Sequence, residues 1–114
     1  MYSKEKYINS QKQVFEELRL EIYQSPDLIN VSSMAAKIGF SLSRFNELYK
    51  NFFDCTPIED LTQARIIRVT ELINNGYTTK EIIQTLGFKS NEYFYRWFKK
   101  HFNSTKNDYI KNTK

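Results

Sequence analysis

The sequence predicts an all-α fold of seven helices, in which one long linking helix separates two smaller helical units. Three observations support this prediction. Only three glycines and two prolines occur among 114 residues, which favours helices joined by short turns. Residues 57–75 form an uninterrupted helical pattern, and the segments before and after it are weakly similar to each other. We expect a single small domain, or two very small ones that share the long helix.

The chain starts with a polar stretch, residues 1–6, and we interpret residues 1–8 as a flexible N-terminus or a cloning remnant. Residues 9–24 are predicted to form an amphipathic helix, because Val14, Leu18 and Ile22 recur every four positions with Phe15 beside them. Ser25 and Pro26 would end this helix. It belongs to a first unit that we place at residues 9–56.

The rest of the first unit is predicted to be a helix, a turn and a second helix. Asn30 is a plausible N-cap for a short helix over residues 31–38, and Gly39 provides the turn. Ser41 then caps a helix that reaches about Phe53. The apolar side of this second helix consists of Leu42, Phe45, Leu48, Tyr49, Phe52 and Phe53.

The linking helix is predicted over residues 57–75. Thr56 and Glu59 have the spacing of a capping box, and Gly76 is a typical residue after a helix end. Its length corresponds to about 28 Å at about 1.5 Å per residue. The broad apolar stripe consists of Ile58, Leu61, Ala64, Ile66, Val69, Leu72 and Ile73, with Asp60 among the polar residues opposite. Arg65 lies within the stripe, and we favour an ion pair with a neighbouring helix over an intermolecular contact there, because an unpaired buried guanidinium is costly.

The second unit, residues 76–114, repeats the pattern of the first. Thr78 and Glu81 form a capping box for a short helix over residues 79–86, and Gly87 provides the turn. A helix over residues 90–102 would follow, with its aromatic residues Phe94, Trp97, Phe98 and Phe102 inward. Thr105 could open a seventh helix containing Tyr109 and Ile110.

The two units match at their glycines and apolar positions. MAAKIGF at residues 34–40 aligns with IIQTLGF at residues 82–88, and RFNELYKNFF at 44–53 aligns with YFYRWFKKHF at 93–102. A short helix, a turn and a second helix with an exposed polar face form a helix-turn-helix, whose second helix enters the major groove of DNA. A linking helix of about 28 Å is comparable with one turn of B-DNA, about 34 Å, so two such units could read successive major-groove segments.

The exposed faces of the two second helices give the candidate DNA contacts, with Leu42 taken as the inward reference in the first unit. They are Ser43, Asn46, Glu47 and Lys50 in the first unit and Asn91, Glu92, Tyr95, Arg96 and Lys99 in the second. Ser41 and Lys89 are candidate phosphate contacts at the helix starts. Arg reads guanine, Asn reads adenine, Glu accepts from cytosine, and Tyr packs on a thymine methyl or binds a phosphate. Glu47 and Glu92 repel phosphates, so they either face base edges or penalise wrong sequences, and both interpretations stay open.

Composition argues against other classes of protein. Seventeen Lys and Arg against thirteen Asp and Glu give a net charge of +4, which favours an anionic partner. One histidine, one cysteine, no metal-ligand spacing and no Gly-rich phosphate loop predict neither an enzyme nor a bound cofactor or metal. We read His101 as a packed histidine. The chain has no signal peptide and no apolar run that could span a bilayer, so we expect a cytoplasmic protein without a membrane partner. The alternative is a helical protein-interaction module without DNA contact, which would require a contiguous exposed apolar groove.

These motifs resemble the DNA-binding domain of the AraC/XylS family of bacterial transcription regulators over residues 9–112. The resemblance is most specific in the second unit, at Glu81-Ile82, Gly87-Phe88, Tyr93-Phe94, Arg96, Phe98-Lys99-Lys100, Phe102 and Tyr109. In the first unit and the linking helix it rests on Ala35, Gly39-Phe40, Phe45, Leu48-Tyr49-Lys50, Thr56-Pro57, Leu61, Arg65-Ile66 and Glu71-Leu72.

The resemblance implies seven helices, two helix-turn-helix units, and activation or repression of promoters with RNA polymerase as a further partner. Family members usually carry a second domain for effector binding or dimerisation, which we expect to be absent from this chain. The sequence departs from the family pattern at several positions. Glu47 stands where many members have Arg, Asp54 and Asn103 replace glycines, Lys106 replaces a proline, and Asp60 replaces an aromatic residue, which predicts looser packing at Asp60 and Lys106.

Overall fold

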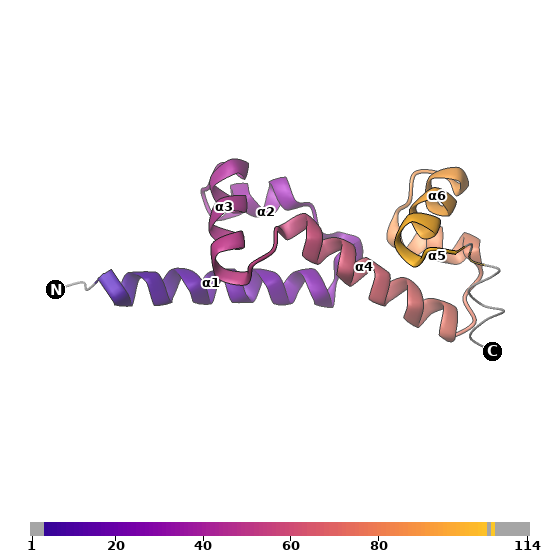
Figure 1. Ribbon diagram of the computed structural model, residues 1–114, viewed down its shortest axis with the longest axis horizontal. Coiled ribbons are helices and arrows are strands. Elements are labelled where there is room, and N and C mark those ends of the chain that lie inside the picture. Colours follow the sequence, from indigo (N-terminus) through magenta and orange to yellow (C-terminus); the bar gives the residue numbers. More distant parts are fainter. Residues whose placement is uncertain (1–3, 105, 107–114) are drawn as a thin grey trace. The chain divides into compact units, whose positions relative to one another are not determined.

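The computed structural model describes residues 4–104 and residue 106, and within that range it is helical without strands (Figure 1). It contains α1 (Lys4–Gln24), the 3-10 turn η1 (Pro26–Leu28), α2 (Val31–Lys37), α3 (Leu42–Phe53), α4 (Pro57–Asn74), α5 (Thr79–Leu86) and α6 (Asn91–Phe102). The all-α prediction is therefore confirmed, with six α-helices in this range instead of seven. The predicted seventh helix starts at Thr105, and apart from residue 106 its residues lie outside the described part of the chain.

The chain divides into two compact units, residues 1–64 and residues 65–114. The boundary lies inside α4, between Ala64 and Arg65. Leu61 and Ala64 of α4 belong to the core of the first unit, whereas Val69 and Leu72 belong to the core of the second. Each half of the linking helix therefore completes a different hydrophobic core.

In the first unit, α2 and α3 pack against each other on one side of α1 (Figure 1). The core consists of Phe15, Leu18, Ile22, Val31, Met34, Ala35, Phe45, Leu48, Tyr49, Leu61 and Ala64. The ring of Phe15 stacks on that of Phe45, with ring centroids 5.3 Å apart. Val14, predicted from its spacing to share this face, is 40% exposed. The buried face of α1 is thus centred on Phe15, Leu18 and Ile22.

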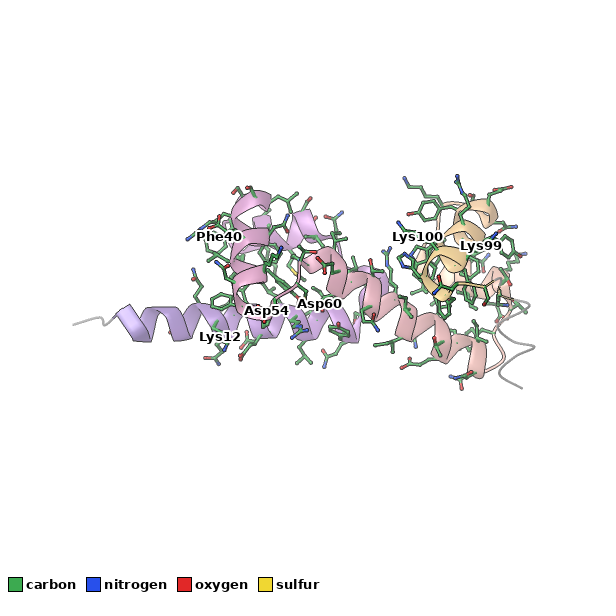
Figure 2. All side chains as sticks on the ribbon, viewed as in Figure 1. Lys12, Phe40, Asp54, Asp60, Lys99 and Lys100 are labelled. Carbon is green, nitrogen blue, oxygen red and sulfur yellow. The ribbon has the colours of Figure 1, made fainter. Side chains whose placement is uncertain are left out.

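Asp60 is buried, which corrects the prediction that it lies on the polar side of the linking helix and loosens the packing. The residue is only 4% exposed, and its carboxylate accepts hydrogen bonds from the Tyr49 hydroxyl, from the Tyr23 hydroxyl at 2.8 Å, and from Arg19 Nε at 2.8 Å. Figure 2 shows Asp60 at the start of α4 next to α1. These donors come from α1 and α3, so the carboxylate ties three helices together. The hydrogen bonds from these donors offset the cost of removing the Asp60 carboxylate from water. An aromatic residue, which the family pattern has at this position, would not need them.

The ion pair predicted for Arg65 is wrong. Among the described residues Arg65 makes no ion pair, and its buried Nε has no hydrogen-bond partner. The salt bridge that links the linking helix to a neighbour is formed by Arg19 and Asp60 instead. Ile58 was also assigned to the apolar stripe, but it is 57% exposed. The stripe narrows at the start of α4 because Asp60 occupies the buried position there.

In the second unit, α5 and α6 pack together over the second half of α4. Its core is formed by Val69, Leu72, Ile82, Leu86, Phe88, Phe94 and Phe98. Trp97 is half-buried against this core, with its ring centroid 5.0 Å from that of Phe88. Lys106, predicted to loosen the packing, is 8% exposed and donates a hydrogen bond from Nζ to the Thr79 hydroxyl at 2.8 Å.

The turns and caps of both units follow the sequence pattern closely. Gly39 and Gly87 have φ of 78° and 72°, a region in which an L-residue with a side chain is strained. Asp54 and Asn103, at the positions after the second helices, also adopt the left-handed conformation, with φ of 60° and 57°. The turn geometry expected of glycine is therefore retained by the two residue types that tolerate it best.

Candidate nucleic-acid interface

The helix α3 presents a polar face because its apolar residues are used in the core of the first unit. The Ser41 hydroxyl accepts a hydrogen bond from the Arg44 amide at 3.2 Å, which caps the helix as predicted. Phe45, Leu48 and Tyr49 are buried on the inner side. The outer side carries the exposed candidates Ser43, Glu47 and Lys50, with exposed Ser41 at the start. Leu42, which was taken as an inward position, is 44% exposed and lies at the edge of this face.

Asn46 differs from the other candidates on α3. Its side chain is half-buried, and its Oδ1 atom is buried without a hydrogen-bond partner. An asparagine that reads adenine bidentately must offer both its carbonyl oxygen and its amide group to the base. With its Oδ1 atom buried, Asn46 does not offer the carbonyl oxygen that this contact needs.

Arg44 is exposed on α3 and was absent from the candidate contacts. Its Nη1 atom lies 2.9 Å from Oε1 of Glu47, and the two side chains are 52% and 61% exposed. The spacing of three residues on a helix is the signal that identifies this pair, because residues i and i+3 are neighbours on a helix surface. The negative charge of Glu47 is thus balanced within the helix.

The helix α6 presents a more basic face. The Ser90 hydroxyl accepts from the Tyr93 amide at 3.1 Å, and Phe94 and Phe98 are buried inward. The exposed residues include all candidates of this helix, namely Asn91, Glu92, Tyr95, Arg96 and Lys99, and Lys89 is exposed in the preceding turn. Figure 2 labels Lys99 together with Lys100, which is also exposed on α6.

The faces differ in electrostatics as well as composition. Positive charges of Lys99 and Lys100 in the last turn of α6 interact favourably with the helix C-terminus. Burial, and next the charge of Lys100, lower the pKa of His101, whose ring centroid lies 5.0 Å from that of Trp97. His101 is therefore neutral at pH 7 and packs with the aromatic residues, so the positive charge of α6 comes from its arginine and lysines.

The Asp60 cluster holds the first of these helices in place. Burial alone would raise the pKa of Asp60, but the hydrogen bonds from Tyr49, Arg19 and Tyr23 outweigh it and lower that pKa. Burial and the bond to Asp60 in turn raise the pKa of Tyr23 to about 12, so its hydroxyl remains a donor at neutral pH. Since Tyr49 belongs to α3, the charged carboxylate fixes the inner side of the helix whose outer side carries the candidate contacts.

Comparison with known proteins identifies the family. A family model described as a helix-turn-helix domain matches residues 34–112, which include the end of α2 and all of α3 to α6. The chain belongs to the AraC-type helix-turn-helix family. Membership supports the resemblance seen in the sequence.

One curated relative is a probable transcription factor, PqrA, of Proteus vulgaris. It is 32% identical to this chain over 78 residues, which cover 68% of this chain and 64% of the relative. No solved structure matches the chain. No helix in the described residues is both long and apolar enough to cross a membrane.

Proposed function

We propose that this chain binds double-stranded DNA sequence-specifically, with α3 and α6 as the recognition helices of a bacterial transcription regulator. The observation that carries the proposal is the repetition of one local structure. In each unit a short helix ends in a turn with a glycine of positive φ, and the next helix starts at a serine cap and turns a polar face outward. A single helical hairpin of this kind would be common, but two in one small chain of this family favour paired readers.

The proposed contacts are the eleven residues that the sequence pattern selects, Ser41, Ser43, Asn46, Glu47, Lys50, Lys89, Asn91, Glu92, Tyr95, Arg96 and Lys99. Ten of them are exposed and Asn46 is half-buried. We propose that the two helices enter successive major-groove segments, as the length of the linking helix suggests. RNA polymerase is the further partner proposed for promoter regulation.

Selection of bound duplexes from a random pool tests the proposal directly. It should return a site with two conserved half-sites, and their spacing measures the separation of the two reading helices on DNA. Loss of Arg96 in an Arg96→Ala variant should relax preference at one or two positions of one half-site by about 1–3 kcal/mol. Arg68→Ala is the matched control, since Arg68 lies on α4, outside the proposed faces, and pairs with Glu71 at 3.6 Å. An unchanged site after Arg96→Ala would remove Arg96 from the set, and a pool without any enriched site would refute sequence-specific binding.

The alternative is a helical module that binds another protein. One shallow hollow in the first unit is lined by Lys12, Glu16, Arg19, Leu20, Tyr23, Phe52 and Phe53, and charged side chains interrupt its apolar surface. Salt dependence separates the two functions. DNA affinity should fall steeply as the salt concentration rises, because counterions are released from each neutralised phosphate. An affinity for duplexes that hardly changes with salt would count against the DNA-binding faces.

A further inference from the structure

The outer face of α3 holds a charge arrangement that the candidate contacts do not explain. Glu47 occupies the middle of the face, where a carboxylate repels the phosphates of DNA. Its partner Arg44 is one turn earlier, with Nη1 to Oε1 at 2.9 Å. Both side chains are more than half exposed, so water screens the pair and it contributes little to the stability of the helix. Arg44 can therefore leave Glu47 for another partner at a small cost in free energy.

Arg44 is also the best-suited group on this face for reading a base. A guanidinium can bind O6 and N7 of guanine with two parallel hydrogen bonds. Asn46 also carries an amide, but its Oδ1 atom is buried. Asn51, the other amide of α3, is exposed but uncharged. Ser43 and Lys50 have no planar fork of donors. Among the exposed side chains of α3, only Arg44 combines a positive charge with a planar fork of donors.

We propose that Arg44 is a specificity-determining residue of the first unit and that Glu47 is its counterion, which releases Arg44 only when a base edge replaces the carboxylate. The inference rests on the proposed function. Away from the correct site, Arg44 can gain only a phosphate contact, and Glu47 both competes for the guanidinium and repels that phosphate. At the correct site, the bidentate acceptor on guanine compensates for the lost ion pair. Glu47 thus lowers non-specific binding more than specific binding.

Four full-length variants test this proposal, namely Arg44→Gln, Glu47→Gln, the double variant and Glu71→Gln. The last is the matched control, because Glu71 forms an ion pair of the same spacing with Arg68 on α4 and its loss changes the net charge equally. Affinities are measured for the selected duplex and for a scrambled duplex at several salt concentrations. Thermal melting by circular dichroism checks that each variant folds.

Glu47→Gln should bind the scrambled duplex more tightly than Glu71→Gln does, with a salt slope steeper by roughly one, as one added phosphate contact requires. The ratio of specific to non-specific affinity should fall. Arg44→Gln should weaken binding to the selected duplex by roughly 5- to 150-fold, the range of one bidentate base contact, and relax the first half-site. In the double variant the salt slope should return to that of the wild type.

Four results would overturn the inference. Equal effects of Glu47→Gln and Glu71→Gln would mean that only net charge matters. Weaker binding of Glu47→Gln to the selected duplex would mean that Glu47 itself contacts a base. If the wild type discriminates the two duplexes and Arg44→Gln binds both as the wild type does, Arg44 does not determine specificity. The proposed function would then remain intact. A wild type that does not discriminate the duplexes would refute the proposed function and this inference with it.

Discussion

Replacing Asp60 with asparagine should destabilise the first unit far more than an ordinary polar substitution. Asp60 is 4% exposed, and its carboxylate accepts hydrogen bonds from Arg19, Tyr23 and Tyr49. Asparagine keeps one oxygen but places an NH2 group against donors, so at least one donor loses its partner and the guanidinium loses its counterion. Hydrogen bonds to charged groups contribute about 1.5–3 kcal/mol each, and breaking a buried pair costs about 3–5 kcal/mol.

The guanidinium of Arg19 is 39% exposed and can regain water, which reduces the loss. We therefore expect Asp60→Asn to cost about 2–4 kcal/mol, the lower part of the combined range. For a unit of this size such a loss lowers the melting temperature by roughly 10–25 °C.

Circular dichroism follows the melting of both units, and the fluorescence of Trp97 reports on the second, where the chain's single tryptophan lies. Glu59→Gln is the matched control, because Glu59 is the exposed neighbouring carboxylate on α4. A variant Asp60→Asn that melts by circular dichroism at the temperature of Glu59→Gln would refute the reasoning that this buried carboxylate organises the first unit.

Three further predictions concern pH and the turns. Because the pKa of Asp60 is lowered on folding, its contribution to stability is complete above the unfolded pKa of about 3.9 and disappears as the pH falls through the lower folded value. The difference in stability between wild type and Asp60→Asn should therefore shrink in acid, as urea titrations at several pH values would show. Gly87→Val should destabilise the second unit by about 1–3 kcal/mol, since φ is 72° and the cost is conformational, with open space around the added Cβ. A Gly87→Val variant that melts at the temperature of the wild type would contradict this prediction. Asp54→Ala should cost about 1 kcal/mol and Asp54→Gly little, because alanine is disfavoured at a φ of 60°. Equal melting temperatures of these two variants would exclude left-handed strain as the cause.

Local sequence signals predicted the helices well because their causes are local. Asn30, Ser41 and Ser90 accept hydrogen bonds from amides three residues later, and Thr78 with Glu81 forms the reciprocal capping box. The glycine turns and the apolar residues of α3 and α6 follow from backbone sterics and helical period in the same way. These features also define the two candidate faces.

The errors concern residues whose environment depends on distant parts of the chain. Asp60 was assigned to the polar side because its type is polar, and its burial requires donors from Arg19 and Tyr23, which are 41 and 37 residues away. The helical periodicity of the sequence does not reveal partners that are so distant along the chain. Arg65 was assigned an ion pair because a charged residue within the apolar stripe was expected to need a partner. In the structure the buried ion pair of α4 is formed by Asp60 and not by Arg65. The three-residue spacing of Arg44 and Glu47 on one helix would have predicted their ion pair. The set of candidate contacts included Glu47 but not Arg44.

The boundary between the cores suggests where natural or designed recombination would be tolerated. A crossover between Ala64 and Arg65 leaves Leu61 with the residues it contacts in one core and Val69 with those in the other. Chimaeras joined at the turns before or after α4 would instead bring a foreign helix into one of the cores. The middle of a regular helix, ordinarily a poor place to splice two proteins, is here the junction that disturbs the fewest buried neighbours.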